Sequence, residues 1–235
     1  GGQGKIHYHV PPAKSLLRSW SEKHGDDISS FRNTVLEISR THLPISGIEV
    51  GRGGFVVRGL SPVFDNQGAY LGSAEVLLGL GSYLNVSKSR DDEELAMFMH
   101  KDLLKIATGF LEQNSSNVSK QKDMVGDFLL IDKTSEKCNL DYITPEVLEK
   151  GSRSITIHEA GNYKYGLYPI YDYDNKMIGV GCYQLDITTF KKELANMEFA
   201  IIGIGFGVII ILLLILGFLI FRLIINPVKT ALSLI

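Results

Sequence analysis

The chain has 235 residues, of which 45% are hydrophobic and 21% are charged, and its formal net charge is −2. This balance, with no heavily basic stripe, excludes a protein that binds nucleic acid through a cationic surface. Cys138 and Cys182 allow one disulfide by count, but their spacing does not support it. The apolar residues are concentrated in segment 199–221, which carries no charged side chain and is long enough to span a bilayer as a helix.

The first third of the chain predicts a strand, a helix and three further strands. Residues 5–10 alternate polar and apolar side chains, as expected of a half-buried strand, and residues 15–20 are expected to form a short helix or turn. Apolar residues at helical spacing predict a helix that starts near residue 26, and a strand is expected at 45–50. A glycine-rich bend then leads into a strand–turn–strand unit at 59–78.

The second part of the chain predicts a long helix followed by another set of strands. Residues 82–113 have an acidic start and an amphipathic pattern, which predicts one helix, and the polar stretch 114–122 is expected to be a linker. Strands are expected at 127–132 and 154–160, with a short helix at 144–151 between them. A second strand–turn–strand unit occupies 166–185, and from residue 188 the chain is expected to run as a helix into the apolar segment.

The two strand–turn–strand units are copies of each other, because residues 166–185 align without a gap on residues 59–78. Repetition of a whole supersecondary unit predicts two related modules. The positions with identical residues are Gly59/Gly166, Leu60/Leu167, Pro62/Pro169, Asp65/Asp172 and Gly72/Gly179. The shared aspartates are best explained by the turns themselves, because an Asp side chain can accept a hydrogen bond from the backbone two residues on and so stabilise the turn.

Three segments of the first module carry a family resemblance: HVPPAKSLLRSW at 9–20, GDDISSFRNTV at 25–35 and GIEVGRGGF at 47–55. With the repeated hairpin and the apolar segment, they resemble the double Cache sensory domains of bacterial transmembrane receptors. The resemblance implies an α+β fold of two PAS-like (Cache) modules, each an antiparallel sheet with flanking helices, plus a C-terminal transmembrane helix. The implied parts are a membrane-distal module at 1–81, a connecting helix and linker at 82–122, a membrane-proximal module at 123–198, a transmembrane helix at 199–221 and the start of a cytoplasmic HAMP linker at 222–235.

The same resemblance implies a function in signal transduction rather than catalysis. The chain is expected to be the extracytoplasmic ligand-sensing region of a methyl-accepting chemotaxis receptor, preceded by a further membrane helix. It would act as a homodimer in the bacterial cytoplasmic membrane, with residues 1–198 outside and 222–235 in the cytoplasm. No cofactor, metal ion or nucleic acid is expected as a partner. Two alternatives stay open: the sensor region of a histidine kinase or diguanylate cyclase, and a membrane-anchored metal- or solute-binding protein.

Candidate ligand-binding residues gather in the first module. Arg18 and Trp20 are the strongest candidates for direct contact with a ligand. A guanidinium holds a carboxylate through two parallel hydrogen bonds, and an indole supplies a flat apolar surface. A small carboxylate-bearing metabolite is therefore expected, and the alternative is a packed structural pair. Amino-acid-binding Cache domains use an aspartate for the amine, and the resemblance assigns that place to Asp65. The complete set of expected ligand-binding residues is His9, Arg18, Trp20, Glu49, Arg52, Arg58 and Asp65.

Other residues of this set have simpler explanations. Glu49 and Arg52 flank the glycine-rich bend and can pair with each other across it, while Arg58 on the following strand can face a pocket. His7 and His9 have the spacing of a two-imidazole metal contact on one strand face. The sequence identifies no third or fourth ligand, so neutral, hydrogen-bonded histidines are the favoured interpretation.

Overall fold

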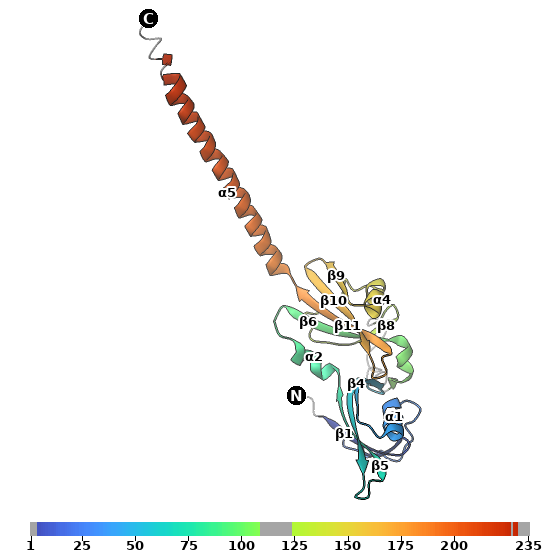
Figure 1. The fold of residues 1–235 in the computed structure, drawn as a ribbon. Coiled ribbons are helices and arrows are strands. Elements are labelled where there is room, and N and C mark those ends of the chain that lie inside the picture. The colour runs from blue at the N-terminus through green and yellow to red at the C-terminus, as the bar shows by residue number, and fades with distance from the viewer. Residues whose placement is uncertain (1–3, 109–123, 227, 230–235) are drawn as a thin grey trace. The chain divides into compact units, whose positions relative to one another are not determined.

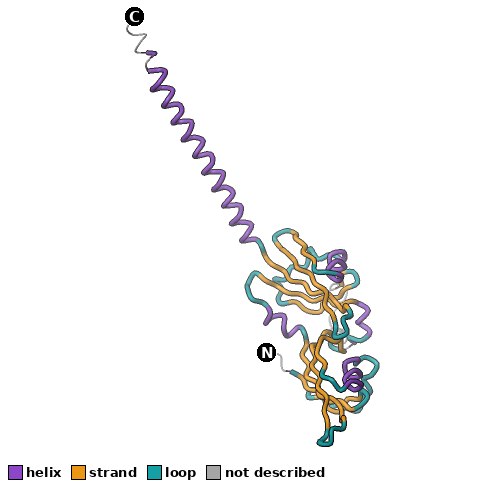
Figure 2. Tube along the Cα trace, viewed as in Figure 1, coloured by secondary structure: helices purple, strands orange, loops and turns teal. Residues whose placement is uncertain are grey.

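The computed structural model describes residues 4–108, 124–226 and 228–229. Gly1–Asp186 form one compact unit, and Ile187–Ile235 form a second unit that consists mainly of helix α5 (Figure 1). The compact unit contains two antiparallel sheets with short helices around them (Figure 2). The α+β prediction, with two sheet modules and a long apolar helix at the C-terminus, is confirmed.

The first module is a five-stranded sheet in the order β2-β1-β5-β4-β3. Its strands are β1 Lys5–Val10, β2 Lys14–Arg18, β3 Ile45–Gly51, β4 Gly54–Phe64 and β5 Tyr70–Gly79. Helix α1, Asn33–Thr41, packs over one face and buries Val35 and Ile38 against Ile28 and Leu60. This apolar core is small, because charged side chains occupy much of the same face of the sheet.

The second module is a six-stranded sheet in the order β7-β8-β6-β11-β10-β9. Its strands are β6 Glu93–His100, β7 Met124–Val125, β8 Phe128–Lys133, β9 Thr156–Ala160, β10 Tyr163–Tyr171 and β11 Met177–Asp186. Helix α4, Pro145–Arg153, covers one face; Pro145 suits its first turn and the Thr144 hydroxyl caps it. The core beneath α4 is mainly apolar and includes Phe98, Leu148 and Leu167.

Both repeated units are antiparallel hairpins, β4–β5 and β10–β11, as predicted. Their turns use the shared aspartate in the same way. The Asp65 carboxylate accepts hydrogen bonds from the backbone N–H groups of Gln67 and Ala69, both at 2.8 Å. The Asp172 carboxylate accepts the two equivalent bonds in its own turn, both at 2.9 Å. The turn-chemistry explanation of this pair is therefore confirmed.

The shared glycine of the repeat lets a neighbouring strand approach closely. A Cβ atom on Gly72 would lie 2.0 Å from the carbonyl oxygen of His9 on β1, and the φ of Gly72 is +151°. A Cβ atom on Gly179 would lie 2.2 Å from the carbonyl oxygen of Phe98 on β6. Since β1 flanks β5 as β6 flanks β11, the two modules use this glycine for the same strand contact.

The single long helix expected at 82–113 is wrong. The structure has a short helix α2, Gly81–Ser87, then strand β6, Glu93–His100, and a 3-10 turn η1, Lys101–Lys105. Strand β6 lies between β8 and β11 in the second sheet and is buried on both faces. A short apolar run of this kind does not distinguish a buried strand from a buried helix. Residues 109–113 and the linker expected at 114–122 lie outside the described residues.

Two expectations for the first module are also corrected. Helix α1 begins at Asn33 and not near residue 26. The Asp26 carboxylate binds Arg18, and the Asp27 carboxylate accepts a hydrogen bond from the backbone of Ser29 at 2.8 Å. The segment expected as a short helix or turn contains strand β2, Lys14–Arg18.

An apolar cluster and a backbone hydrogen bond connect the two modules. Val50 and Phe55 of the first module pack in one cluster with Ile170 and Ile178 of the second. The backbone N–H of Tyr173, in the second repeated turn, donates to the carbonyl of Ile48 at 2.9 Å. Strand β3 is therefore the part of the first module that the second hairpin contacts.

Helix α5, Thr188–Ile220, runs without a break through the apolar segment, as predicted. A five-residue π-helical turn, Phe221–Ile225, extends it. In the part of the chain that the structure describes, Thr188–Ile225 is the one helix long and apolar enough to cross a membrane, with a mean hydropathy of 3.3 over its most apolar 18 residues. The HAMP-like exit expected after it includes Pro227, which lies outside the described residues.

Candidate functional site

A cleft of about 480 Å³ opens beside the first sheet, between β1, β5, the Gly51–Gly54 bend and the residues that precede α1. Its lining is strongly cationic, and among the described residues no aspartate or glutamate lines it. Trp20 and Phe31 supply aromatic surface. The cationic lining residues are Lys5, Arg18, Lys23, Arg32, Arg52 and Arg58.

Arg18 is held by a carboxylate of the protein itself. Its guanidinium donates to both oxygens of Asp26, at 2.7 and 2.9 Å, and to the carbonyl of Lys23 at 2.6 Å. The hydrogen bonds from Arg18 hold the pKa of Asp26 below its usual value, against the opposing effect of burial. The two parallel hydrogen bonds that the sequence analysis assigned to a ligand carboxylate are made to Asp26 instead. Arg18 therefore orders the loop beside the cleft.

Arg32 and Arg58 are held by two buried glutamates, Glu49 and Glu75. Arg32 donates to Glu49 at 2.9 Å and to Glu75 at 2.5 Å, and Arg58 donates to Glu75 at 2.8 Å. The side chains of all four are at most 7% exposed. The two arginine charges are thus neutralised by the two glutamate charges. Charged groups are buried at acceptable cost only when they are paired in this way.

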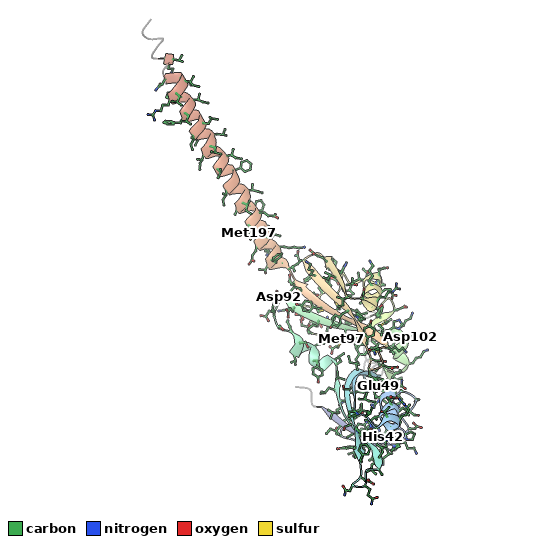
Figure 3. All side chains as sticks on the ribbon, viewed as in Figure 1. His42, Glu49, Asp92, Met97, Asp102 and Met197 are labelled. Atoms are coloured by element: carbon green, nitrogen blue, oxygen red, sulfur yellow. The ribbon has the colours of Figure 1, made fainter. Side chains whose placement is uncertain are left out.

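Glu49 also completes helix α1. Its carboxylate accepts the backbone N–H of Thr34 at 3.0 Å and the Thr34 hydroxyl at 2.9 Å. The residue at the start of α1, Arg32, makes no capping bond of its own. A glutamate from β3 therefore satisfies an N–H group of the first helical turn and ties the helix to the sheet (Figure 3 labels Glu49).

The electrostatic environment of this cluster shifts the pKa values of its members. Burial and the nearby Arg32 lower the pKa of Arg58. Burial alone would raise the pKa of Glu75, but the adjacent His7 and His9 rings and the two guanidinium charges outweigh it and hold that pKa far below its usual range. Glu75 is therefore a carboxylate at any ordinary pH.

His7 and His9 lie next to Glu75 in the interior of the module. His7 Nε2 is 2.8 Å from the Ser15 hydroxyl, and His9 Nδ1 is 3.0 Å from the Ser73 hydroxyl. Burial lowers the pKa of both imidazoles, to about 4 for His9, so both are neutral at neutral pH. Both rings therefore have a hydroxyl group within hydrogen-bonding distance, and this arrangement is compatible with either of the two interpretations of the pair.

Arg52 and Lys5 are the cleft cations without a carboxylate partner among the residues that the structure describes. The Arg52 guanidinium lies 5.3 Å from the centre of the Phe31 ring, and the Lys5 ammonium lies 5.5 Å from that of Trp20. Both side chains are exposed at the cleft. Aromatic faces position these cations without neutralising them, so they remain available to an anion.

The second module shows what the same positions contain without this cluster. The repeat aligns Glu75 with Cys182 and Arg58 with Tyr165, and both second-module residues lie in the apolar core. His7 faces Glu75 across β1 and β5, and the residue that faces Cys182 is Ala96. A module of this fold therefore forms with apolar residues at these positions. The charged set of the first module is a specialisation and is not needed to form the fold.

The structure brings most, but not all, of the sequence-predicted site residues together. Arg18, Trp20, Arg52 and Arg58 line the cleft, while Glu49 and His9 are buried behind it. Asp65 is not among the cleft residues, and its carboxylate is engaged in the turn at the end of the β4–β5 hairpin. The expected pairing of Glu49 with Arg52 is wrong, because Glu49 binds Arg32.

Sequence reasoning missed Glu75, Arg32 and the two lysines of the cleft. Glu75 carried a readable signal: it is the one charged residue in strand Tyr70–Gly79, and it shares its face with buried Ser73 and Leu77. Arg32 was hidden because residues 28–38 were interpreted as one helix. Its position before α1 turns its side chain toward the sheet, where it meets Glu49.

A second hollow, of about 530 Å³, lies in the second module and has the opposite character. Acidic side chains dominate its lining, including Asp92, Glu136 and Asp141. The Cys138 thiol also lines it, and Cys138 and Cys182 are both free. An anionic ligand is electrostatically excluded from this hollow and attracted to the cleft.

Comparison with protein families gives one match, over residues 4–120, just under half of the chain. The matching family, dCache_3, is described as the double sensory domain of two-component sensor kinases. Residues 4–120 are therefore similar to the sensory domains of this family. The matched residues precede the candidate membrane span α5 in the chain. No curated protein sequence matches the chain.

Solved structures similar to this chain include two ligand-binding proteins. One is an extracellular ligand-binding receptor from Desulfohalobium retbaense, with 14% identity and a TM-score of 0.45 over 78% of this chain. The chain spans 30% of that protein. The other is the ligand-binding domain of the amino acid chemoreceptor PctC of Pseudomonas aeruginosa in complex with GABA. It shares 13% identity and a TM-score of 0.37 over 77% of this chain and 71% of its own length.

Proposed function

We propose that the cleft of the first module binds a small anionic, carboxylate-bearing metabolite and that this chain is the sensing region of a bacterial chemoreceptor. The observation that carries the proposal is the cleft lining, with its six cationic side chains and no carboxylate among the described residues. Three of these cations share three carboxylates of the protein, Asp26, Glu49 and Glu75. Lys23 shares Asp26 with Arg18, at 3.9 Å. The cations without a carboxylate partner among the described residues are Arg52 and Lys5, and a ligand carboxylate would neutralise their charge.

In this proposal Arg52 and Trp20 make the direct contacts. Arg52 lies in the two-residue loop between β3 and β4, since Gly51 pairs with Gly54 across that bend. Trp20 lines the same cleft, with Lys5 over its ring. Arg18 shapes the wall through Asp26. Asp65 has no direct role here, although an amine-bearing ligand would need a carboxylate of this kind.

Strand β3 offers a route from the cleft to the second module. Glu49 on this strand holds Arg32 of the cleft, while the neighbouring residues Ile48 and Val50 contact the second module. A ligand that draws Arg32 or Arg52 toward itself would shift β3 and the second hairpin, whose strand β11 leads toward α5. The ligand shifts this equilibrium only by its difference in affinity for the two states.

The proposed receptor is a methyl-accepting chemotaxis protein that acts as a homodimer in the cytoplasmic membrane. Residues 1–198 would lie outside, 199–221 would cross the membrane, and 222–235 would begin a cytoplasmic HAMP linker. The description of the matching family favours one alternative output, the histidine kinase of a two-component system. Sequence beyond residue 235 separates the two, because a chemoreceptor continues into a helical signalling hairpin and a kinase into a phosphoacceptor helix with an ATP-binding domain.

The binding proposal is tested by calorimetric titration of the full chain in detergent with mono-, di- and tricarboxylates and with the matching neutral amides. We expect saturable binding of a carboxylate and none of its amide. Arg52→Gln should weaken binding by about 10- to 100-fold, the value of one charge-assisted hydrogen bond. Arg40→Gln, which changes an exposed arginine of α1 paired with Glu37, is the matched control and should bind as the wild type does. Equal affinity for carboxylate and amide would refute the proposal.

A further inference from the structure

Three buried side chains of the first module each direct one donor atom toward a common point. His7 Nδ1 and His9 Nε2 are 2.9 Å apart, and each is 3.4 Å from Glu75 Oε2. All three side chains are at most 3% exposed. The three atoms come from two adjacent strands, β1 and β5, which fix their spacing through the sheet.

We propose that His7 Nδ1, His9 Nε2 and Glu75 Oε2 are three ligands of a divalent transition-metal ion of the Zn²⁺ type. A tetrahedral ion with bonds of about 2.0–2.1 Å places its donor atoms about 3.3 Å from one another. The separations in the structure, 2.9, 3.4 and 3.4 Å, match this triangle with shifts of a few tenths of an ångström. Two imidazoles with one carboxylate form a donor set that suits zinc and its neighbours, whereas Ca²⁺ and Mg²⁺ prefer oxygen ligands alone.

The surroundings orient each donor toward the site. The second nitrogen of each ring faces a hydroxyl, Ser15 for His7 and Ser73 for His9, which fixes the ring orientation as outer hydrogen bonds do in metal sites. Arg32 and Arg58 both bind Glu75 Oε1 and leave Oε2 to point at the imidazoles. Among the described residues, Glu75 Oε2 is a buried carboxylate oxygen without a hydrogen-bond partner. An unsatisfied, fully buried oxygen of this kind needs an explanation, and a bound cation supplies one.

Access and charge are consistent with an ion that has one open coordination position. His7 lines the cleft, so the site connects to solvent through it. The two arginines and two glutamates already balance, so a divalent ion would add two positive charges and would favour an anionic fourth ligand. Hydroxide, or a carboxylate from the cleft, meets this need. The ion site itself does not depend on the proposed anion-sensing function.

The first test measures metal content and affinity of the untagged full chain in detergent. The protein is stripped with a chelator, equilibrated with Zn²⁺, dialysed and analysed for bound metal, and its affinity is measured by competition with a chromogenic zinc chelator. We expect one ion per chain. Co²⁺ should give the intense visible absorption of a four-coordinate ion and should quench Trp20, whose ring lies 5.5 Å from that of His7. No bound zinc, or only the weak bands of six-coordinate Co²⁺, would overturn the proposal.

Variants then assign the ligands. His9→Ala and Glu75→Gln should each abolish stoichiometric zinc binding, whereas His24→Ala, at an exposed histidine outside the cluster, should leave it unchanged. Ser73→Ala keeps all three ligands but removes the hydroxyl beside His9, and it should weaken zinc binding by about 10- to 100-fold. This variant therefore tests the site even if a ligand variant fails to fold. Wild-type affinity in His9→Ala would mean that the two rings share only a hydrogen bond. Carboxylate binding by the metal-free chain is measured separately, so failure of one proposal leaves the other standing.

Discussion

Replacement of Glu75 by glutamine should destabilise the first module strongly, although it preserves the size of the side chain. Glu75 accepts hydrogen bonds from Arg32 at 2.5 Å and from Arg58 at 2.8 Å, and its side chain is fully buried. Glutamine removes the negative charge and leaves one of the two guanidinium charges unbalanced. Loss of one member of a buried ion pair costs about 3–5 kcal/mol. Since no atoms are deleted, this cost contains no cavity contribution.

Urea denaturation of the full chain measures this cost through the fluorescence of Trp20, the single tryptophan, which lies in the first module. A chelator is included so that no metal ion contributes to stability. With a urea dependence of about 1–3 kcal/mol/M, the midpoint should fall by roughly 2 M. Glu37→Gln, which removes a carboxylate from an exposed pair on α1, is the control and should leave the midpoint close to that of the wild type.

A double variant sharpens the test. Adding Arg58→Met to Glu75→Gln restores the balance of charges, because Arg32 and Glu49 remain paired. The double variant should therefore be more stable than the sum of the two single losses predicts, by about 1–3 kcal/mol. A loss below about 1 kcal/mol for Glu75→Gln, or strictly additive effects, would refute the account of a balanced buried cluster.

Three further predictions concern the repeat, the cysteines and the cleft wall. Gly72→Ala should lower the unfolding free energy by more than about 2 kcal/mol in urea denaturation, because its Cβ would lie 2.0 Å from a carbonyl oxygen of β1. Gly59→Ala is the control and should cost far less in the same assay, because its Cβ would have no neighbour within 4 Å. Burial raises the pKa of Cys138 to about 11, so alkylation of the native chain at neutral pH should be about 100-fold slower than alkylation of the urea-unfolded chain; equal rates would contradict the burial. Arg18→Ala should weaken carboxylate binding at least about tenfold in the calorimetric titration, because it leaves the Asp26 charge unpaired beside the cleft; unchanged affinity would remove that pair from the site.

The repeat and the local turn chemistry made much of the fold predictable. Two aligned hairpins with a shared Asp and Gly predicted two related sheets, and both hairpins form with the predicted turns. Strand β6 was not predictable in the same way, because an apolar run buried on both faces has no strand period to read. The start of α1 was missed because Asp26 pairs with Arg18 of strand β2, and because the bond from Asp27 to the Ser29 backbone is local and does not start the helix.

For the site, the sequence predicted the region and the residue types but not their pairing. Arg18 and Trp20 do line one cleft, as their proximity in the chain indicated. Which arginine keeps its charge available depends on contacts between segments far apart in sequence, such as Arg32 with Glu75. Spacing along the chain cannot report such contacts. Besides the polar residues that gather in the first module, the alignment of Glu75 with Cys182 within the repeat is a sequence signal that marks this module as the specialised copy.

In the proposed receptor, the first module recognises an anion and the second module transmits the signal. Hydrogen–deuterium exchange of the full chain, with and without a bound carboxylate, can separate these two roles. We predict slower exchange in β2, in the Gly51–Gly54 bend and in β3, with a smaller change in the turn around Tyr173 that bonds Ile48. Protection confined to the second module, around Glu136 and Asp141, would contradict the division of roles between the two copies.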